Sequence, residues 1–222
     1  MGASSSFRTS LLLGKAWRII SQPTDPRVVR TNERLRQALS TLLQEMSFKQ
    51  VSVQKLTQAA AITRGTFYLH YQDKADFLAQ TEQQVIDEWL AAGKTLLAPY
   101  GHPVNGFALG PALRYVDDHH QILMVLLQPQ FAHFRTQLQQ RLEQELLVFS
   151  QQLPQSNVLT SPLDVQVSFL ATGFIGVIDH WLADDRRYRP DYLAQAFQQL
   201  LPLESLPVAA WFAPINPEKR WQ

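Results

Sequence analysis

The amino-acid sequence predicts an all-α fold, and three observations lead to that prediction. Apolar residues recur every three or four positions through most of the 222 residues, which is the period of a helix with one buried face. No stretch alternates between apolar and polar residues over a length that would indicate a strand. Prolines and short polar residues stand where the periodic runs begin or end, as helix boundaries require.

The first three expected helices are close together in the sequence. A long helix runs over about 26–46, with leucines on one face and basic residues away from them. Ser52 is placed to cap a short helix over 53–60, and Thr63 to cap a second short helix over about 64–70. Ala61 and Ile62 between them form a turn, so the two short helices have the spacing of a helix-turn-helix unit.

The rest of the chain predicts a larger group of helices. Asp73 caps a helix that Lys74 opens and whose apolar residues continue to Ala92. Three prolines and three glycines make residues 99–111 a loop. Later helices are expected over 113–127 (one or two helices), 131–153, 162–183 and 189–201.

These segments divide the chain into four parts. The three-helix helix-turn-helix domain covers 25–73, and the larger helical domain covers 74–205. Residues 1–24 form an extension without the uncharged apolar stretch of a secretory signal, because Lys15 and Arg18 interrupt it. Residues 206–222 form a proline-rich tail.

The charges of the chain are unevenly distributed. Residues 1–76 hold 11 Lys and Arg against 5 Asp and Glu, a balance of +6, whereas residues 77–222 hold 9 against 14, a balance of −5. A polyanionic partner is therefore expected for the first part only. The chain has no cysteine, which excludes disulfides and thiolate metal sites.

The second short helix carries side chains suited to DNA. Arg64 can bind guanine or phosphate, and the hydroxyls of Thr63, Thr66 and Tyr68 can contact phosphate. Gly65 has no side chain where the helix would approach a duplex. The residues that this chemistry predicts to bind DNA are Thr63, Arg64, Gly65, Thr66, Tyr68, His70 and Lys74. The predicted core residues behind this helix are Leu56, Phe67 and Tyr71.

Residues 62–78, ITRGTFYLHYQDKADFL, closely resemble the signature of the TetR family of transcriptional regulators. Tyr71 stands where that family usually has phenylalanine, and the resemblance covers residues 26–90. It implies a cytoplasmic all-α homodimer that binds a palindromic operator, with the DNA-contact roles carried by Ser52 and by the DNA-binding residues named above. It also implies that a C-terminal ligand-binding and dimerisation domain releases the protein, usually a repressor, from DNA when a small molecule binds.

The resemblance extends to two further groups of residues by architecture alone. In that family the last two long helices pair with their copies, which predicts an interface at Phe169, Gly173, Gly176, Val177, Trp181, Tyr192 and Phe197. Aromatic residues of the larger domain either form plain core or line an effector pocket for an apolar or aromatic molecule. The pocket candidates are Trp89, Tyr115, Phe131, Phe134 and Phe174.

Other classes of protein were weighed against this one. Residues 165–183 are apolar enough to suggest a membrane span, but Gln166, Asp179 and His180 favour a buried helix instead. His119 and His120 lack further ligands for a metal, and no catalytic constellation is visible, so no cofactor, metal or enzyme activity is expected. One alternative stays open: a DNA-binding protein of this fold that acts through a protein partner, without a small ligand.

Overall fold

The computed structural model describes residues 26–97, 103–153, 161–201, 203 and 206–212, and it confirms the all-α class. The elements, in chain order, are α2 (Pro26–Glu45), η1 (Phe48–Gln50), α3 (Val53–Ala59), α4 (Arg64–Tyr68), α5 (Lys74–Gly93), β1 (Lys94–Leu97), β2 (Val104–Phe107), α6 (Leu109–Asp118), α7 (His120–Leu126), η2 (Pro129–Phe131), α8 (Ala132–Ser150), α9 (Leu163–Ala183), α10 (Pro190–Gln199) and η3 (Pro207–Phe212). The N-terminal extension lies outside the described residues.

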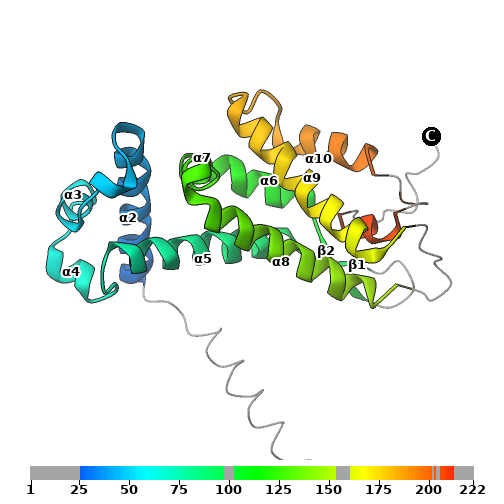
Figure 1. The fold of residues 1–222 in the computed structure, drawn as a ribbon, viewed down its shortest axis with the longest axis horizontal. Coiled ribbons are helices and arrows are strands. Elements are labelled where there is room, and N and C mark those ends of the chain that lie inside the picture. The colour runs from blue at the N-terminus through cyan, green and yellow to red at the C-terminus, as the bar shows by residue number, and fades with distance from the viewer. Residues whose placement is uncertain (1–25, 98–102, 154–160, 202, 204–205, 213–222) are drawn as a thin grey trace, which may run out of the picture.

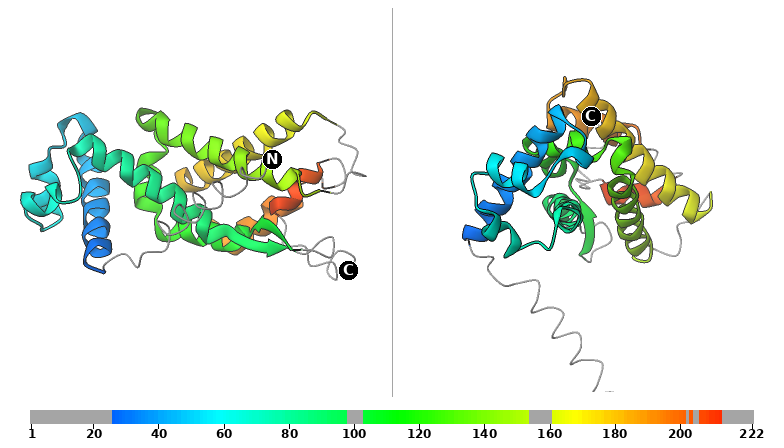
Figure 2. Two further views of the ribbon diagram at one scale, coloured as in Figure 1. Left: turned by 90° about the horizontal axis from the view of Figure 1, so that it is seen from below. Right: turned by 60° about the vertical axis from the view of Figure 1, so that its left-hand side comes forward.

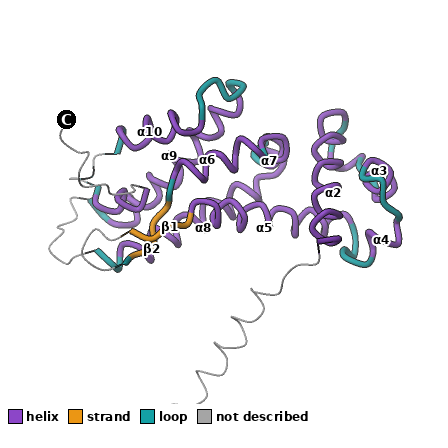
Figure 3. The backbone as a smooth tube through the Cα atoms, turned by 180° about the vertical axis from the view of Figure 1, so that it is seen from behind, coloured by secondary structure: helices purple, strands orange, loops and turns teal. Residues whose placement is uncertain are grey.

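Figure 1 shows a small group of helices, α2 to α4, at one end of an elongated molecule. The 20-residue helix α5 leaves this group and runs into the larger group formed by α6 to α10. Figure 3 shows the same division from behind. One helix thus belongs to both groups, with buried Phe77 near its start and buried Trp89 near its end.

The larger group is built around a core of aromatic rings. α8 packs along α9, and α6 packs against both α5 and α10. The Phe174 ring of α9 lies 6.0 Å from the Trp89 ring and 5.5 Å from the Phe197 ring, centroid to centroid. Rings from three helices therefore meet at one point, where they bury a large apolar area.

The expectation of a loop over 99–111 is partly wrong, because β2 (Val104–Phe107) lies within it and pairs with β1 in a two-stranded antiparallel hairpin, and α6 already begins at Leu109. Lys94 pairs with Phe107, and Leu97 pairs with Val104. Strands of four residues are too short for an alternating pattern to be recognised in a sequence. The hairpin is held by Phe107, which is buried and lies so close to Gly93 that a Cβ there would overlap its ring.

The segment expected to be a tail contributes to the core. Residues 207–212 form η3, and Val208, Trp211 and Phe212 are buried. The Trp211 ring stacks on Phe107 at 4.7 Å, and the Phe212 ring lies 5.1 Å from Phe174. Figure 2 shows η3 in red inside the larger group of helices. Residues 213–222 of the expected tail lie outside the described part of the chain.

Helix α9 is the segment whose composition suggested a membrane span. It has the length and mean hydropathy for crossing a bilayer, and half of it is buried inside the protein. Its buried residues, among them Leu170, Phe174 and Ile178, face α7, α8 and η3. The Asp179 carboxylate accepts a 2.6 Å hydrogen bond from Arg135. This arrangement is that of a core helix with one exposed face, as expected from the polar residues it contains.

Candidate nucleic-acid interface

The turn between α3 and α4 is set by backbone hydrogen bonds at the end of α3. The Ser52 hydroxyl accepts from the Lys55 N–H at the start of this helix. At its end, the Ile62 N–H donates to the Thr57 carbonyl at 3.0 Å and the Ala61 N–H donates to the Gln58 carbonyl at 3.1 Å. This is the Schellman pattern, which requires a left-handed residue, and Ala61 has φ of 51°. An alanine therefore occupies a position that favours glycine.

Helix α4 starts with a well-formed cap. The Thr63 hydroxyl accepts a 3.0 Å hydrogen bond from the Thr66 N–H, and the two threonine hydroxyls lie 2.9 Å apart. A cap of this kind typically contributes about 1 kcal/mol of helix stability. The cap fixes where α4 begins and so fixes which of its residues face outward.

The inner side of α4 is anchored by one aromatic residue. Phe67 is completely buried, and its ring lies 5.3 Å from Tyr71 and 5.9 Å from Phe77. The Tyr71 hydroxyl donates a 2.8 Å hydrogen bond to Asn32 of α2. Leu56 of α3 is also buried in this cluster, so the three residues expected behind the helix all lie in the core.

The outer side of α4 is polar and exposed. Thr63, Arg64 and Gly65 are exposed, and 55% of Tyr68 is accessible to solvent. Ser52 is exposed at the start of α3, whereas Thr66 and His70 are half-buried. We call the exposed side chains of Ser52, Thr63, Arg64 and Tyr68, with Gly65, the reader surface. It lies at the far end of the molecule from the aromatic core (Figure 2).

Gly65 has no packing reason inside the protein to be a glycine. A Cβ built there meets only the Thr63 hydroxyl, at 3.6 Å, which is ordinary van der Waals contact. A glycine inside a helix costs about 1 kcal/mol relative to alanine. Packing inside the protein therefore does not explain the glycine, and the expectation that this position approaches a DNA duplex stays a prediction.

The Lys74 side chain is used within the protein. Its ammonium donates to the carbonyls of Phe48, Lys49 and Val51 at 2.9, 3.2 and 2.8 Å, and it lies 4.8 Å from the centre of the Phe48 ring. An ammonium group has three N–H donors, and all three are satisfied here. We therefore assign Lys74 to joining the start of α5 to η1, and we leave it out of the reader surface.

Sequence reasoning missed two residues near this surface. The Gln54 side chain on α3 accepts a 2.6 Å hydrogen bond from Arg64, so it orients the guanidinium. Leu69, which follows the last residue of α4, is 81% exposed and lies beside the reader surface. In helices as short as α3 and α4, the residue type does not show whether a side chain points toward the core or toward solvent. That orientation depends on where the N-cap sets the start of the helix.

The residues expected at a dimer interface fall into two groups. Phe169 and Tyr192 are 63% and 58% exposed, and a Cβ at Gly173 or Gly176 would meet nothing. Val177 is half-buried. Two of the expected residues, Trp181 and Phe197, instead lie inside the protomer.

Their burial has a clear physical cause. The Trp181 indole donates a 2.9 Å hydrogen bond to the Tyr188 carbonyl, and the Phe197 ring packs on Phe174 and Phe212. We therefore omit Trp181 and Phe197 from the proposed dimer surface.

The five effector-pocket candidates are not gathered around one cavity. Trp89, Phe134 and Phe174 are buried in the core of the larger group, while Phe131 packs edge-on against Phe48 of η1 at 6.0 Å. The Trp89 indole N–H is buried without a hydrogen-bond acceptor in the described part of the chain. This donor needs an acceptor from outside the described chain, such as an ordered water or a bound molecule.

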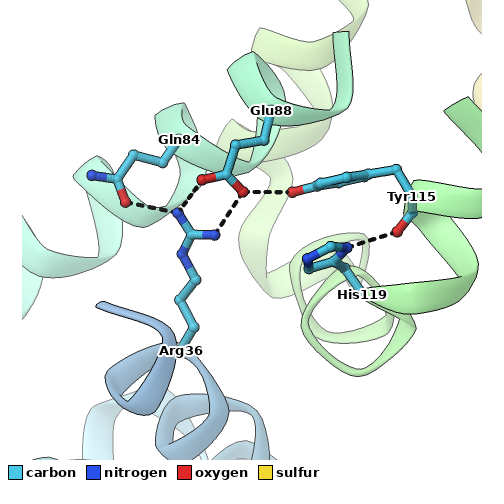
Figure 4. Close-up of polar contacts among 5 residues, drawn as sticks. All are labelled: Arg36, Gln84, Glu88, Tyr115 and His119. Atoms are coloured by element: carbon cyan, nitrogen blue, oxygen red, sulfur yellow. Dashed lines mark hydrogen bonds and ion pairs between the residues drawn. The ribbon is translucent and has the colours of Figure 1, made fainter. Parts of the chain in front are cut away.

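Tyr115, the fifth candidate, lies at the junction between the two groups of helices (Figure 4). Its hydroxyl donates to Glu88 at 2.9 Å, and the same carboxylate accepts two hydrogen bonds of 2.8 Å from Arg36 of α2. Arg36 also donates to Gln84 at 2.8 Å. We call this network of Arg36, Gln84, Glu88 and Tyr115 the junction network.

The junction network shifts the pKa values of Glu88 and Tyr115 in opposite directions. Burial alone raises the pKa of Glu88, but the hydrogen bond and charge of Arg36 outweigh burial and leave that pKa below its usual range. Burial, followed by the charge of Glu88, raises the pKa of Tyr115. The carboxylate therefore stays ionised and the phenol stays neutral, which keeps α2 and α5 joined.

Comparisons with known proteins agree with the geometry. Residues 35–81 match the family described as "Bacterial regulatory proteins, tetR family", and residues 108–202 match "Transcriptional regulator C-terminal region". A relative from Bacillus subtilis (strain 168), the "Uncharacterized HTH-type transcriptional regulator YxbF", is 22% identical over 175 residues, which cover 75% of this chain. The match covers 43% of that relative, so the chain spans less than half of its length.

Two solved structures share the fold. The multidrug-efflux repressor NalD of Pseudomonas aeruginosa is 19% identical, with a TM-score of 0.54 over 78% of this chain and 96% of that one. The dihydroxyacetone kinase operon activator DhaS is 16% identical, with a TM-score of 0.53 over 80% of this chain and 97% of that one. The two family matches, which together cover most of the chain, show that it belongs to the TetR family of transcriptional regulators, a family of DNA-binding proteins rather than enzymes.

Proposed function

We propose that the protein is a homodimeric, sequence-specific repressor that binds a palindromic operator and leaves it when a small molecule binds. The observation that carries the DNA-binding part is the reader surface: α4 exposes Arg64 and Tyr68 while Phe67 holds it from behind. A helix presented in this way fits the major groove, where a guanidinium can bind a guanine with two hydrogen bonds. A bacterial regulator with this function acts in the cytoplasm, because that is where its operator DNA lies.

The dimer brings two reader surfaces to one operator. The exposed face of α9 around Phe169, Gly173 and Gly176, together with Tyr192 of α10, is apolar and offers close approach at the glycines. A face of this kind on two copies related by a two-fold axis would bury its own exposed rings. We expect Phe169→Glu to convert the dimer into a monomer in sedimentation experiments, whereas Met124→Glu, at another exposed apolar position, leaves it dimeric.

The DNA-binding proposal is tested by operator selection from a random DNA pool, followed by anisotropy titrations at several salt concentrations. Arg64→Ala is expected to cost about 1–3 kcal/mol of binding free energy and to relax the preference at one base pair of each half-site. Tyr68→Phe removes a phosphate contact, so it should weaken binding to all sequences equally.

The matched control is Lys94→Ala, which removes one exposed positive charge from β1, far from the reader surface. Its affinity for DNA should equal that of the wild type. Selection that returns no enriched palindrome, or an Arg64→Ala variant with unchanged base preference, would contradict the proposal.

The release by a small molecule is supported by the continuity of α5. This helix starts beside the reader surface at Lys74 and carries Trp89 into the aromatic core near its other end, and the indole N–H of Trp89 has no acceptor in the described chain. A molecule bound near Trp89 would act on DNA affinity only by preferring one position of this helix. An effector should therefore lower operator affinity, and a Trp89→Phe variant should respond less to it.

A second candidate function is activation through a protein partner. It is favoured by the structural likeness to DhaS, which is described as an operon activator. A reporter gene behind the selected operator separates the two candidates. Repression relieved by metabolites supports the first, and activation that requires a second protein supports the other.

A further inference from the structure

The junction between α2 and the larger group of helices contains a cavity that the proposed function does not use. Its volume is about 590 Å³, within the range of small-molecule sites. α2 supplies Asn32, Glu33 and Arg36, and α5 supplies Gln84 and Glu88. The third wall is the turn between α6 and α7. We call this space the junction cavity; Figure 4 shows part of its wall.

The lining of the junction cavity is negatively charged. It holds three carboxylates, Glu33, Glu88 and Asp118, against one guanidinium, Arg36, a balance of −2 with His119 neutral. Glu88 is already paired with Arg36. Glu33 and Asp118 have no ion-pair partner within the described chain, so two carboxylates remain for a ligand. Asp118 is also the last residue of α6, where the helix dipole favours a positive charge.

His119 adds a hydrogen-bond acceptor to this lining. Its Nδ1 lies 2.9 Å from the Tyr115 carbonyl oxygen, which can only accept, so Nδ1 carries the proton of the neutral ring. The other nitrogen, Nε2, is then an acceptor. The ring itself is stacked on Tyr115 at 4.1 Å, which holds it in place. His119 therefore favours a ligand that donates hydrogen bonds, as the carboxylates of Glu33 and Asp118 do.

Apolar side chains complete the wall. Val29 of α2 and Ile122 of α7 line the cavity beside the charged residues. A ligand with an apolar body and a positive, hydrogen-bond-donating head matches both parts of the lining. An anion would face these two carboxylates, and the one guanidinium of the lining, Arg36, is already paired with Glu88 and keeps a single buried N–H, at Nε, without an acceptor in the described chain.

From these observations we propose that the junction cavity binds a small organic cation, such as an amine or an amidine with an apolar body. Such a ligand would touch α2 of the DNA-binding group and α6–α7 of the larger group at once. Asn32, which lines the cavity, accepts the hydrogen bond of Tyr71, and Tyr71 packs on Phe67 behind α4. Occupancy would therefore change the position of the reader surface, a consequence that rests on the proposed function.

The test uses the full chain without DNA and three small probes of the same shape. Benzamidine is cationic, benzamide is neutral and benzoate is anionic. In calorimetric titrations benzamidine should bind with a dissociation constant on the order of 1 mM, as expected for a ligand of its size, and the other two should bind at least tenfold more weakly. The double variant Glu33→Gln, Asp118→Asn should weaken benzamidine binding by about tenfold.

Glu45→Gln is the matched control, because it removes one exposed glutamate from α2, the helix of Glu33, at a position outside the cavity. It should bind benzamidine like the wild type, and the His119 ring signals in NMR spectra should move on titration. Equal affinity for benzamide or benzoate would overturn the proposal, as would a double variant with unchanged affinity or the absence of saturable benzamidine binding.

Operator affinity is measured separately, with and without benzamidine. A change of severalfold that the double variant abolishes supports the link to the reader surface, and no change overturns that link. The cation titrations contain no DNA, so the absence of benzamidine binding would contradict the cation site without affecting the evidence for operator binding. Likewise, the absence of operator binding would contradict the proposed function without affecting the cation site.

Discussion

The two ends of this molecule are stabilised in different ways. At the reader end, α3 and α4 are short, their ends are set by the caps at Ser52 and Thr63, and Phe67 anchors α4 from behind. At the other end, Phe174 meets rings from helices and segments far apart in the chain. The reader surface can therefore change with little effect on the core beneath it, whereas the aromatic core has no exposed side at which a residue can change freely.

The largest expected effect is the loss of the single anchor of the reader end. Phe67→Ala should lower the free energy of unfolding by about 3–5 kcal/mol, because it opens a cavity in a closely packed aromatic cluster. Tyr68→Ala, one position further, should change it by no more than about 0.5 kcal/mol because this side chain is exposed. Urea denaturation measures both. Equal losses in the two variants would contradict the division into an inner and an outer side.

A second test addresses the junction that joins the two ends. Because Arg36 lowers the pKa of Glu88, the pair stabilises the fold fully above the usual glutamate pKa of about 4.3, and this stability is lost as the pH falls through the lower folded value. Glu88→Gln should cost about 1 kcal/mol at pH 7, a small amount because the carboxylate is partly exposed.

The difference between wild type and Glu88→Gln should shrink as the pH is lowered from about 5 to 3, since protonated glutamate resembles glutamine. Denaturation curves at several pH values measure it. Glu45→Gln, an exposed glutamate of α2 outside the junction network, serves as the control and should show no such difference. A penalty for Glu88→Gln that is constant with pH would mean that the ion pair does not join the two ends.

The third test separates binding from stability at one position. Gly65→Ala should stabilise the fold by about 0.5–1 kcal/mol, because alanine is the better helix residue and its Cβ has space. The same Cβ would stand between α4 and a duplex, so operator affinity should fall. Thermal unfolding and DNA titration on one preparation measure both quantities. If affinity is unchanged, Gly65 does not face the DNA.

The smallest expected effect concerns the turn between α3 and α4. Ala61→Gly should stabilise the protein by about 0.5 kcal/mol, because it removes the strain of an alanine with φ of 51°. Ala59→Gly, two positions earlier in α3, should destabilise it by about 0.5–1 kcal/mol. Opposite signs are thus expected for the same substitution, and two variants with the same sign would contradict the Schellman turn.

Much of the fold could be predicted because its information is local. The starts of α3, α4 and α5 follow from Ser52, Thr63 and Asp73, whose side chains accept hydrogen bonds from the backbone N–H groups that follow them. The inner position of Phe67 follows from the helical period once the cap is known. The hairpin at Phe107 and the burial of Phe212 could not be predicted in this way, because each depends on partners distant in sequence.

The sequence alone therefore determined the fold class, the helix-turn-helix and its family, because caps, periodicity and a run of signature residues act over a few positions. Only the tertiary structure decided that Lys74 binds three carbonyls, that Trp181 and Phe197 are buried within the protomer, and that a charged cavity lies between α2, α5 and the turn from α6 to α7. The physical reason is that a side chain's partners are chosen by the packing of whole helices, and that packing is absent from any short stretch of sequence.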